Sequence, residues 1–158
     1  MDRQQLHELL YQALETEQGG VKVYETALRC VQNADLREEW EEYLDQTQKH
    51  EQILLEVFEK LGLDPDSESP GRLVVRHKGQ ALVHAMEIAL DEGEPAAAEL
   101  VAAECVVEAE TKDHLNWQLM GQLAQKLTGD EAKALKAAHE EVEDEEDEHL
   151  YHTKGWGR

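Results

Sequence analysis

The sequence predicts an all-α fold, a bundle of long helices, and three observations support this. Apolar residues recur at helical spacing through most of the chain, and no segment shows the alternation of a strand. Only three prolines and ten glycines interrupt the 158 residues, and Ala, Leu, Glu, Lys and Gln, which favour helix, dominate the composition. A chain of this length is expected to form one domain, residues 1–158, with a core of its own.

The composition is strongly acidic, with 15 Lys and Arg residues against 36 Asp and Glu residues and a net charge of −21. Such a surface repels nucleic acid and anionic membrane, so we expect neither as a partner, and it concentrates cations. Cys30 and Cys105 lie inside helical patterns without metal-type spacing and are expected to be buried, reduced thiols. The N-terminal segment lacks the apolar run of a signal peptide or a membrane span, so a cytoplasmic location is expected.

The first half of the chain is predicted to be a pair of long helices over residues 3–62. The first helix carries a continuous apolar stripe, and Gly19-Gly20 in its middle indicates a bulge or a close helix approach. A turn follows at 33–35, with Asp35 as the candidate N-cap of the second helix, which Gly62 ends. The inward residues are Leu6, Leu10, Leu14, Val21, Tyr24, Leu28 and Val31 on the first helix, and Trp40, Tyr43, Leu54, Val57, Phe58 and Leu61 on the second.

The second half begins with a Pro-, Ser- and Gly-containing loop, residues 63–74, followed by a short helix over 75–92. Pro95 suits the first turn of the next helix, which is predicted to run to about residue 127. After a turn at 128–130, a last helix covers about 131–151, so 95–152 forms a second helix pair. Four long helices and one added short helix between the second and third predict a four-helix bundle.

Acidic and imidazole side chains interrupt the apolar stripes of the first two helices. Glu17 lies between Leu14 and Val21 at the centre of the first apolar face, and His50 lies midway between Tyr43 and Val57 on the second. An ionised carboxylate inside a bundle costs several kcal/mol unless it is paired or bound to a metal. These positions are therefore candidate ligands, although a single inward Glu or His is more often a satisfied buried polar residue.

The third and fourth long helices show the same feature. Glu104 and Glu108 lie within a stripe on the third, with Glu110 farther round and His114 at the edge; the other members of the stripe are Leu100, Val107, Thr111, Leu115, Gln118 and Gln122. On the fourth helix, Leu135, Val142, His149 and Trp156 recur every seven residues, and Glu146 precedes His149 by one turn.

Each long helix thus offers at least one inward acid or imidazole. The predicted metal ligands are Glu17, His50, Glu104, Glu108, Glu146 and His149. Carboxylates and imidazoles from four facing helices are what two metal ions bridged by carboxylates require in a bundle core. Hard oxygen donors with imidazole suit iron or manganese, so Fe, as a di-iron centre, or Mn is the expected cofactor.

Glu17 with Tyr24 seven residues later, His50 on the next helix, and Glu146-x-x-His149 resemble the ferritin-like superfamily, in particular its bacterioferritin and rubrerythrin branch. The segments AAECVVEAETKDHLNW and EEDEHLYHTKGW resemble small bacterial ferritin-like proteins. The resemblance implies a ferritin-like four-helix bundle in which the first and third helices each give a Glu, and the second and fourth each give Glu-x-x-His.

The chain departs from that pattern at Thr47, which stands where the bridging Glu of the second helix is expected. The site then recruits Glu51 or Glu108, holds one metal ion, or has lost the metal. The rubredoxin-like cysteine module of full rubrerythrins does not occur in this sequence.

Two functions follow as expectations. The first is a non-haem di-iron or manganese protein that reacts with O2 or peroxide, as a ferroxidase or peroxidase-type oxidoreductase, in oxidative-stress defence or iron handling. The second is a non-catalytic helical bundle that has lost the metal site. A haemerythrin-like carrier is disfavoured because the sequence has no His-x-x-x-His pair. A single bundle offers little room for the rings of all three tryptophans, Trp40, Trp117 and Trp156, so a homodimer that covers one of them is expected.

Overall fold

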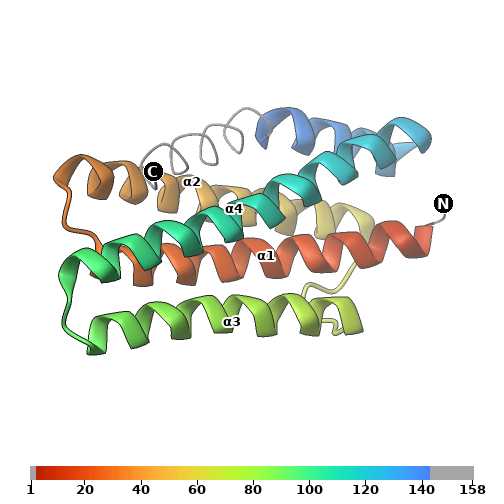
Figure 1. The fold of residues 1–158 in the computed structure, drawn as a ribbon. Helices are drawn as coiled ribbons and strands as arrows, with labels where there is room; N and C mark the ends of the chain where they lie inside the picture. The colour runs from red at the N-terminus through yellow and green to blue at the C-terminus, as the bar shows by residue number, and fades with distance from the viewer. Residues whose placement is uncertain (1–2, 143–158) are drawn as a thin grey trace.

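The computed structural model describes residues 3–142, and within this range it is all helical apart from short connections (Figure 1). Its elements are α1 (Arg3–Cys30), α2 (Ala34–Leu61), α3 (Pro70–Asp91) and α4 (Pro95–Lys126). A further helical segment runs from residue 130 to the end of the described range at 142. No strand occurs in the described residues, so the predicted all-α class is confirmed.

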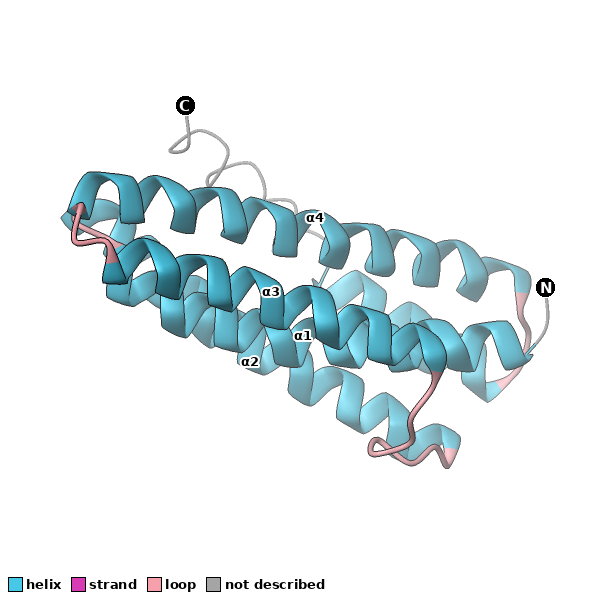
Figure 2. Ribbon diagram, turned by 60° about the horizontal axis from the view of Figure 1, so that its bottom comes forward, coloured by secondary structure: helices cyan, strands magenta, loops and turns pink. Residues whose placement is uncertain are grey.

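Helix α1 is the central element of the fold. It packs against α2, α3 and α4, and α3 also packs against α4. The views in Figures 1 and 2 show these helices running lengthwise beside one another, with α3 on the outside. None of the described helices is both long and apolar enough to cross a membrane.

The core divides into two apolar clusters along the length of the helices. One contains the C-terminal part of α1, the N-terminal part of α2 and the alanine-rich start of α4, around Tyr24 and Trp40. The other contains the opposite ends of these helices, around Phe58 and Trp117, and is covered by the 130–142 segment through Leu135 and Val142. The middle turns of α1, α2 and α4 lie between the clusters, and this is where buried polar residues gather.

The helix boundaries differ from the prediction at two places. Asn33, not Asp35, caps α2, because its side-chain oxygen accepts a hydrogen bond from the backbone N–H of Leu36 at 3.0 Å. Helix α3 begins at Pro70 instead of residue 75, with Ser69 as its N-cap. A capping serine followed by proline is a helix-start signal, so residues 70–74 belong to a helix of 22 residues and not to the loop.

The predicted inward residues of α1 and α2 are buried except for Val21, Leu28 and Leu61, which are partly exposed, whereas the predicted inner face of α4 is wrong. Leu100 and Leu115, expected inside, are 51% and 47% exposed, whereas a face of small residues, including Ala98, Ala102 and Cys105, is buried. Small side chains let α4 lie close to its neighbours, and this close packing outweighs the greater apolar area of the leucines.

Helix α1 continues through Gly19-Gly20 without a bulge, and the close approach lies at Gly20, where an added Cβ would be 3.4 Å from Cγ2 of Thr47 on α2. A Cβ atom on Gly79 of α3 would lie 4.0 Å from the Cα atom of Gly19, so the two helices meet at glycines. A Cβ on Gly19 itself would meet nothing within 4 Å. Gly19 therefore leaves open space beside α1.

The substitution Gly19→Ala is expected to raise the free energy of unfolding by about 0.5–1 kcal/mol, because it removes the helix penalty of glycine without a clash. Gly121→Ala is the matched control inside α4. Its Cβ would lie 2.5 Å from the Nε2 atom of His139, so we expect destabilisation by about 1–3 kcal/mol. Urea unfolding measures both values, and equal effects of the two substitutions would contradict this packing.

Candidate metal centre

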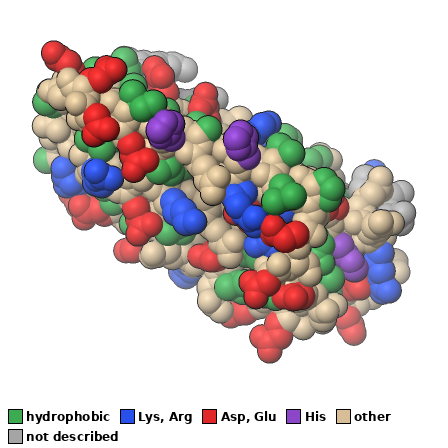
Figure 3. All heavy atoms as spheres, turned by 90° about the horizontal axis from the view of Figure 1, so that it is seen from below, with side chains coloured by type: hydrophobic (Ala, Val, Ile, Leu, Met, Phe, Trp, Pro, Cys, Tyr) green, Lys and Arg blue, Asp and Glu red, His purple; other side chains and the backbone are tan. Residues whose placement is uncertain are grey.

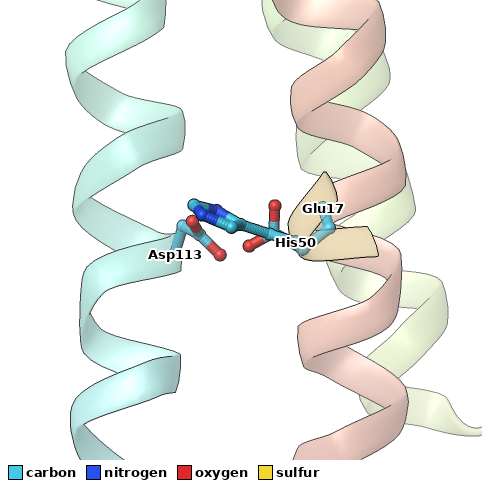
Figure 4. Close-up of side chains that lie close together, drawn as sticks. All are labelled: Glu17, His50 and Asp113. Atoms are coloured by element: carbon cyan, nitrogen blue, oxygen red, sulfur yellow. The ribbon is translucent and has the colours of Figure 1, made fainter. Parts of the chain in front are cut away.

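Three potential metal ligands from three helices meet in the polar layer between the two clusters. Glu17 comes from α1, His50 from α2 and Asp113 from α4, and one donor atom of each lies within 4.8 Å of the other two. Figure 4 shows the carboxyl groups of Glu17 and Asp113 and the imidazole of His50 converging in the space between the helices. Their residues are 1%, 0% and 5% exposed, so bulk water does not solvate the group.

The ring of Trp117, one turn beyond Asp113 on α4, holds Glu17 in place. Its Nε1–H donates a hydrogen bond to Oε1 of Glu17 at 3.0 Å. This bond orients the carboxyl group, and a hydrogen bond of this kind behind a ligand is a regular feature of metal centres in proteins. Trp117 is itself buried in the second apolar cluster, so its position is fixed by packing.

The pKa of Glu17 is raised well above its ordinary value. Burial is the main cause, and the negative charge and hydrogen bond of Asp113 add to it; the charge of His50 and the bond from Trp117 act in the opposite direction. Without a metal ion, Glu17 is therefore held protonated at pH values where an exposed glutamate has lost its proton. A bound cation would replace that proton.

Thr47, which takes the place of the expected bridging glutamate, does not contribute its hydroxyl to the centre. Thr47 Oγ1 donates to the backbone oxygen of Tyr43 at 2.8 Å, within α2. Its methyl group faces Gly20 of α1, where an added Cβ would lie 3.4 Å away. The threonine is thus a packing residue in this layer, and the second carboxylate of the centre comes from Asp113 on α4.

The polar layer extends from the centre along the contact between α1 and α4. Asn116 Nδ2 donates to Thr16 Oγ1 at 2.9 Å, and Lys112 Nζ donates to Asn116 Oδ1 at 2.8 Å and to Gln12 Oε1 at 3.2 Å. Burial lowers the pKa of Lys112, the charge of Lys78 lowers it further, and Asp113 opposes both. Glu110, one turn before Asp113, is also buried, at 3% exposure.

The structure brings together two of the six predicted ligands. Glu17 and His50 lie in the centre, whereas Glu104 and Glu108 are exposed on the outer side of α4. The prediction that Glu104 and Glu108 face inward is wrong, because the buried side of α4 is its alanine-bearing side. Glu146 and His149 lie outside the described residues and remain predictions.

Asp113 was missed, although the sequence holds a signal for it. Val106, Asp113 and Met120 recur every seven residues, and both apolar members of this series are fully buried. The sequence prediction takes the leucine-bearing side of α4 as the inner face, so Asp113 lies outside its stripe. Glu110, which precedes Asp113 by three residues, is the weaker candidate there for the same reason.

Comparisons of the chain with protein-family models, with curated proteins and with solved structures found no match. The geometry of Glu17, His50 and Asp113 is therefore the observation from which a function can be inferred.

Proposed function

We propose that this chain is a ferritin-like helical bundle protein that binds iron or manganese at Glu17, His50 and Asp113. The observation that carries the proposal is the convergence of three buried donors from three helices within 4.8 Å. Two carboxylate oxygens and one imidazole nitrogen are donors that suit these metals.

The electrostatics of the centre support a cation. Glu17 and Asp113 place two acidic groups side by side in an interior where each ionised carboxylate costs several kcal/mol. The net charge of −21 draws cations toward the molecule. A divalent ion bound between the two carboxyl groups would allow both to ionise.

The burial of the centre restricts what can react there. With exposures of 0–5% for the three residues, a bulky organic substrate does not fit at the centre, so the reactant that we propose is a small one, O2 or peroxide. Bound iron or manganese supplies one-electron redox chemistry. The reaction class we propose is therefore oxidation of Fe(II) by O2 or peroxide, in iron handling or oxidative-stress defence.

The three described donors are enough for one metal ion. A di-iron centre needs further donors, and because Glu104 and Glu108 are exposed, the remaining predicted donors are Glu146 and His149. The substitution His149→Ala therefore distinguishes a di-iron centre from a centre with one metal ion. It lowers the metal content from two ions to one in a di-iron protein and leaves it unchanged in a protein with one ion.

A second candidate, a non-catalytic bundle without metal, is favoured by one specific observation. Trp117 donates a hydrogen bond to Oε1 of Glu17, and Asp113 lies beside it, so a protonated Glu17 carboxyl group can share its proton with Asp113. In this version the shared proton takes the place of the metal, and the polar layer serves only to fix the alignment of the three helices.

Anaerobic titration of the metal-free protein with Fe(II) or Mn(II) separates the two candidates. We expect saturable binding, and a loss of affinity of more than about 100-fold in Asp113→Asn and in His50→Ala, because even changes behind a ligand cost about 10–100-fold. Glu104→Gln and Glu108→Gln are matched controls that remove exposed carboxylates of the same helix. Equal affinities in all four variants would falsify the proposed centre.

A further inference from the structure

A groove opens between α1, α3 and α4, where Gln12, Thr16 and Lys112 of the polar layer line it and the three residues of the metal centre do not. Helices α3 and α4 lie close at the turn that joins them and then diverge, with α1 visible between them (Figure 1). The cavity there has a volume of about 740 Å³. This size lies in the range of about 300–1,000 Å³ that is typical of small-molecule sites.

The walls of the groove are aliphatic. Val74 on α3 and Leu115 on α4, which are 53% and 47% exposed, line it from opposite sides, and Leu82 lines it farther along α3. The described residues that line it include no aromatic side chain. Gly19 forms part of the floor, where an added Cβ would meet nothing within 4 Å. The shape and lining thus suit a narrow, flexible hydrocarbon chain better than a flat ring.

Two lysines, Lys78 of α3 and Lys112 of α4, line the same groove and lie near enough to repel each other. The hydrogen bonds of Lys112 go to the amide oxygens of Gln12 and Asn116, which do not neutralise its charge. Figure 3, seen from the α3 side, shows basic side chains next to apolar ones on this face. The chain has a net charge of −21, so two neighbouring lysines in an apolar groove differ from the acidic character of the rest of the molecule.

The two acidic residues that line the groove, Glu15 and Glu108, do not neutralise the positive charge of Lys78 and Lys112. Glu15 is held by Arg72 at 2.8 Å and by Arg76 at 2.9 Å. Glu108 is exposed, at a position where water screens its charge. An anionic group placed between Lys78 and Lys112 would relieve their mutual repulsion and gain two charge-assisted hydrogen bonds.

We propose that this groove binds an aliphatic monocarboxylate, a medium-chain fatty acid. Its carboxylate lies between Lys78 and Lys112, and its chain lies along Val74, Leu82 and Leu115. The site is distinct from the metal centre and does not depend on the bound metal.

Isothermal titration calorimetry of the metal-free protein with decanoate, below its micelle concentration and with EDTA present, tests the proposal. We expect saturable binding of one decanoate per chain. Lys78→Gln, at an exposed position, is expected to weaken it by about tenfold or more. Gly19→Leu, which fills the floor of the groove, is expected to abolish it. Lys49→Gln, an exposed lysine on α2, is the matched control and leaves the affinity unchanged.

Decylamine distinguishes a carboxylate-specific site from non-specific hydrophobic binding. It has the same hydrocarbon chain with a cationic head group, and we expect it not to bind. Absence of saturable decanoate binding, equal affinity for decylamine, or unchanged affinity in Lys78→Gln would overturn the proposal. Because EDTA keeps metal out of this titration, a failure of the metal centre and a failure of this groove are separate results.

Discussion

Substituting Glu17 by Gln is expected to stabilise the metal-free protein by about 2 kcal/mol at neutral pH and to weaken metal binding by more than about 100-fold. Glutamine has the shape of glutamate and keeps the acceptor for Trp117 Nε1, while its amide group can donate to Asp113. It removes a buried group that must otherwise be held protonated. If one substitution both stabilises the metal-free protein and weakens metal binding, then the carboxylate serves to bind metal and not to stabilise the fold.

The pH dependence of unfolding gives a second readout of the same substitution. The folded-state pKa of Glu17 is raised, so above the ordinary glutamate pKa the unfolded chain releases a proton that the folded chain retains. The stability of the metal-free wild type should therefore fall, relative to Glu17→Gln, by up to about 1.4 kcal/mol per pH unit as the pH rises between the unfolded and folded pKa values.

Glu104→Gln is the matched control, because it removes the same charge from an exposed position on α4. Urea unfolding at a series of pH values measures the difference between each variant and the wild type. For Glu104→Gln, the difference in unfolding free energy from the wild type should not change with pH. If the same holds for Glu17→Gln, then Glu17 is not a buried group with a raised pKa.

Replacing Arg72 by Met is expected to destabilise the protein by about 3 kcal/mol, the largest effect on stability that we predict. Arg72 is 4% exposed and joins the α2–α3 loop to α1. Its guanidinium group donates to Glu15 Oε1 at 2.8 Å, to the backbone oxygen of Ser67 at 3.0 Å and to Gln18 Oε1 at 3.2 Å. Methionine leaves these acceptors without that donor, and Arg76 still holds Glu15, so the loss should fall at the lower end of the about 3–5 kcal/mol range.

The double variant Glu15→Gln with Arg72→Met checks the cause, because it removes the buried charge together with its partner. It should be more stable than Arg72→Met alone. Burial by itself raises the pKa of Glu15, but hydrogen bonds and charges from Arg76 and Arg72 together bring it below the ordinary value. The contribution of Glu15 is thus present above the unfolded pKa and is lost as the pH falls through the folded pKa.

The pair Arg3–Glu131 provides a comparison on the surface, since the Arg3 side chain is 73% exposed. Arg3→Met is expected to change the stability by less than about 1 kcal/mol, because water and salt screen an exposed pair. Thermal unfolding followed by circular dichroism measures all of these variants. Similar losses for Arg3→Met and Arg72→Met would show that the Arg72 network contributes no more than a surface ion pair.

The sequence is sufficient to predict α1 and α2 and the burial of Glu17 and His50 on their inner faces. Their stripes contain large apolar side chains at regular spacing, so Glu17 and His50 stand out as polar residues on a face that has to be buried. The buried thiols of Cys30 and Cys105 followed from the same patterns. In α1 and α2, the face that the hydrophobic periodicity predicts to be buried is the face that packs against the other helices.

The orientation of α4 could not be obtained in that way, because its leucines and its alanines lie on different sides. Leu100 and Leu115 have the larger apolar area, but Ala98 and Ala102 allow the closer helix contact, and the fold buries the alanines. A prediction that takes the leucine side as the inner face leaves out Asp113, which is buried, and places Glu104 and Glu108 inside, although both are exposed. The Arg72 network was missed because it joins a loop to two helices that are far apart in the sequence, and periodicity within one helix does not report such contacts.

Anomalous X-ray scattering from crystals of the protein soaked in Mn(II) or Fe(II) tests the central claim most directly. We expect an anomalous peak about 2.1 Å from donor atoms of Glu17, His50 and Asp113, with Trp117 still bonded to Glu17. A map in which Glu17 and Asp113 hydrogen-bond directly to each other, with no anomalous peak between them at saturating metal, would contradict the claim that this buried group is a metal centre.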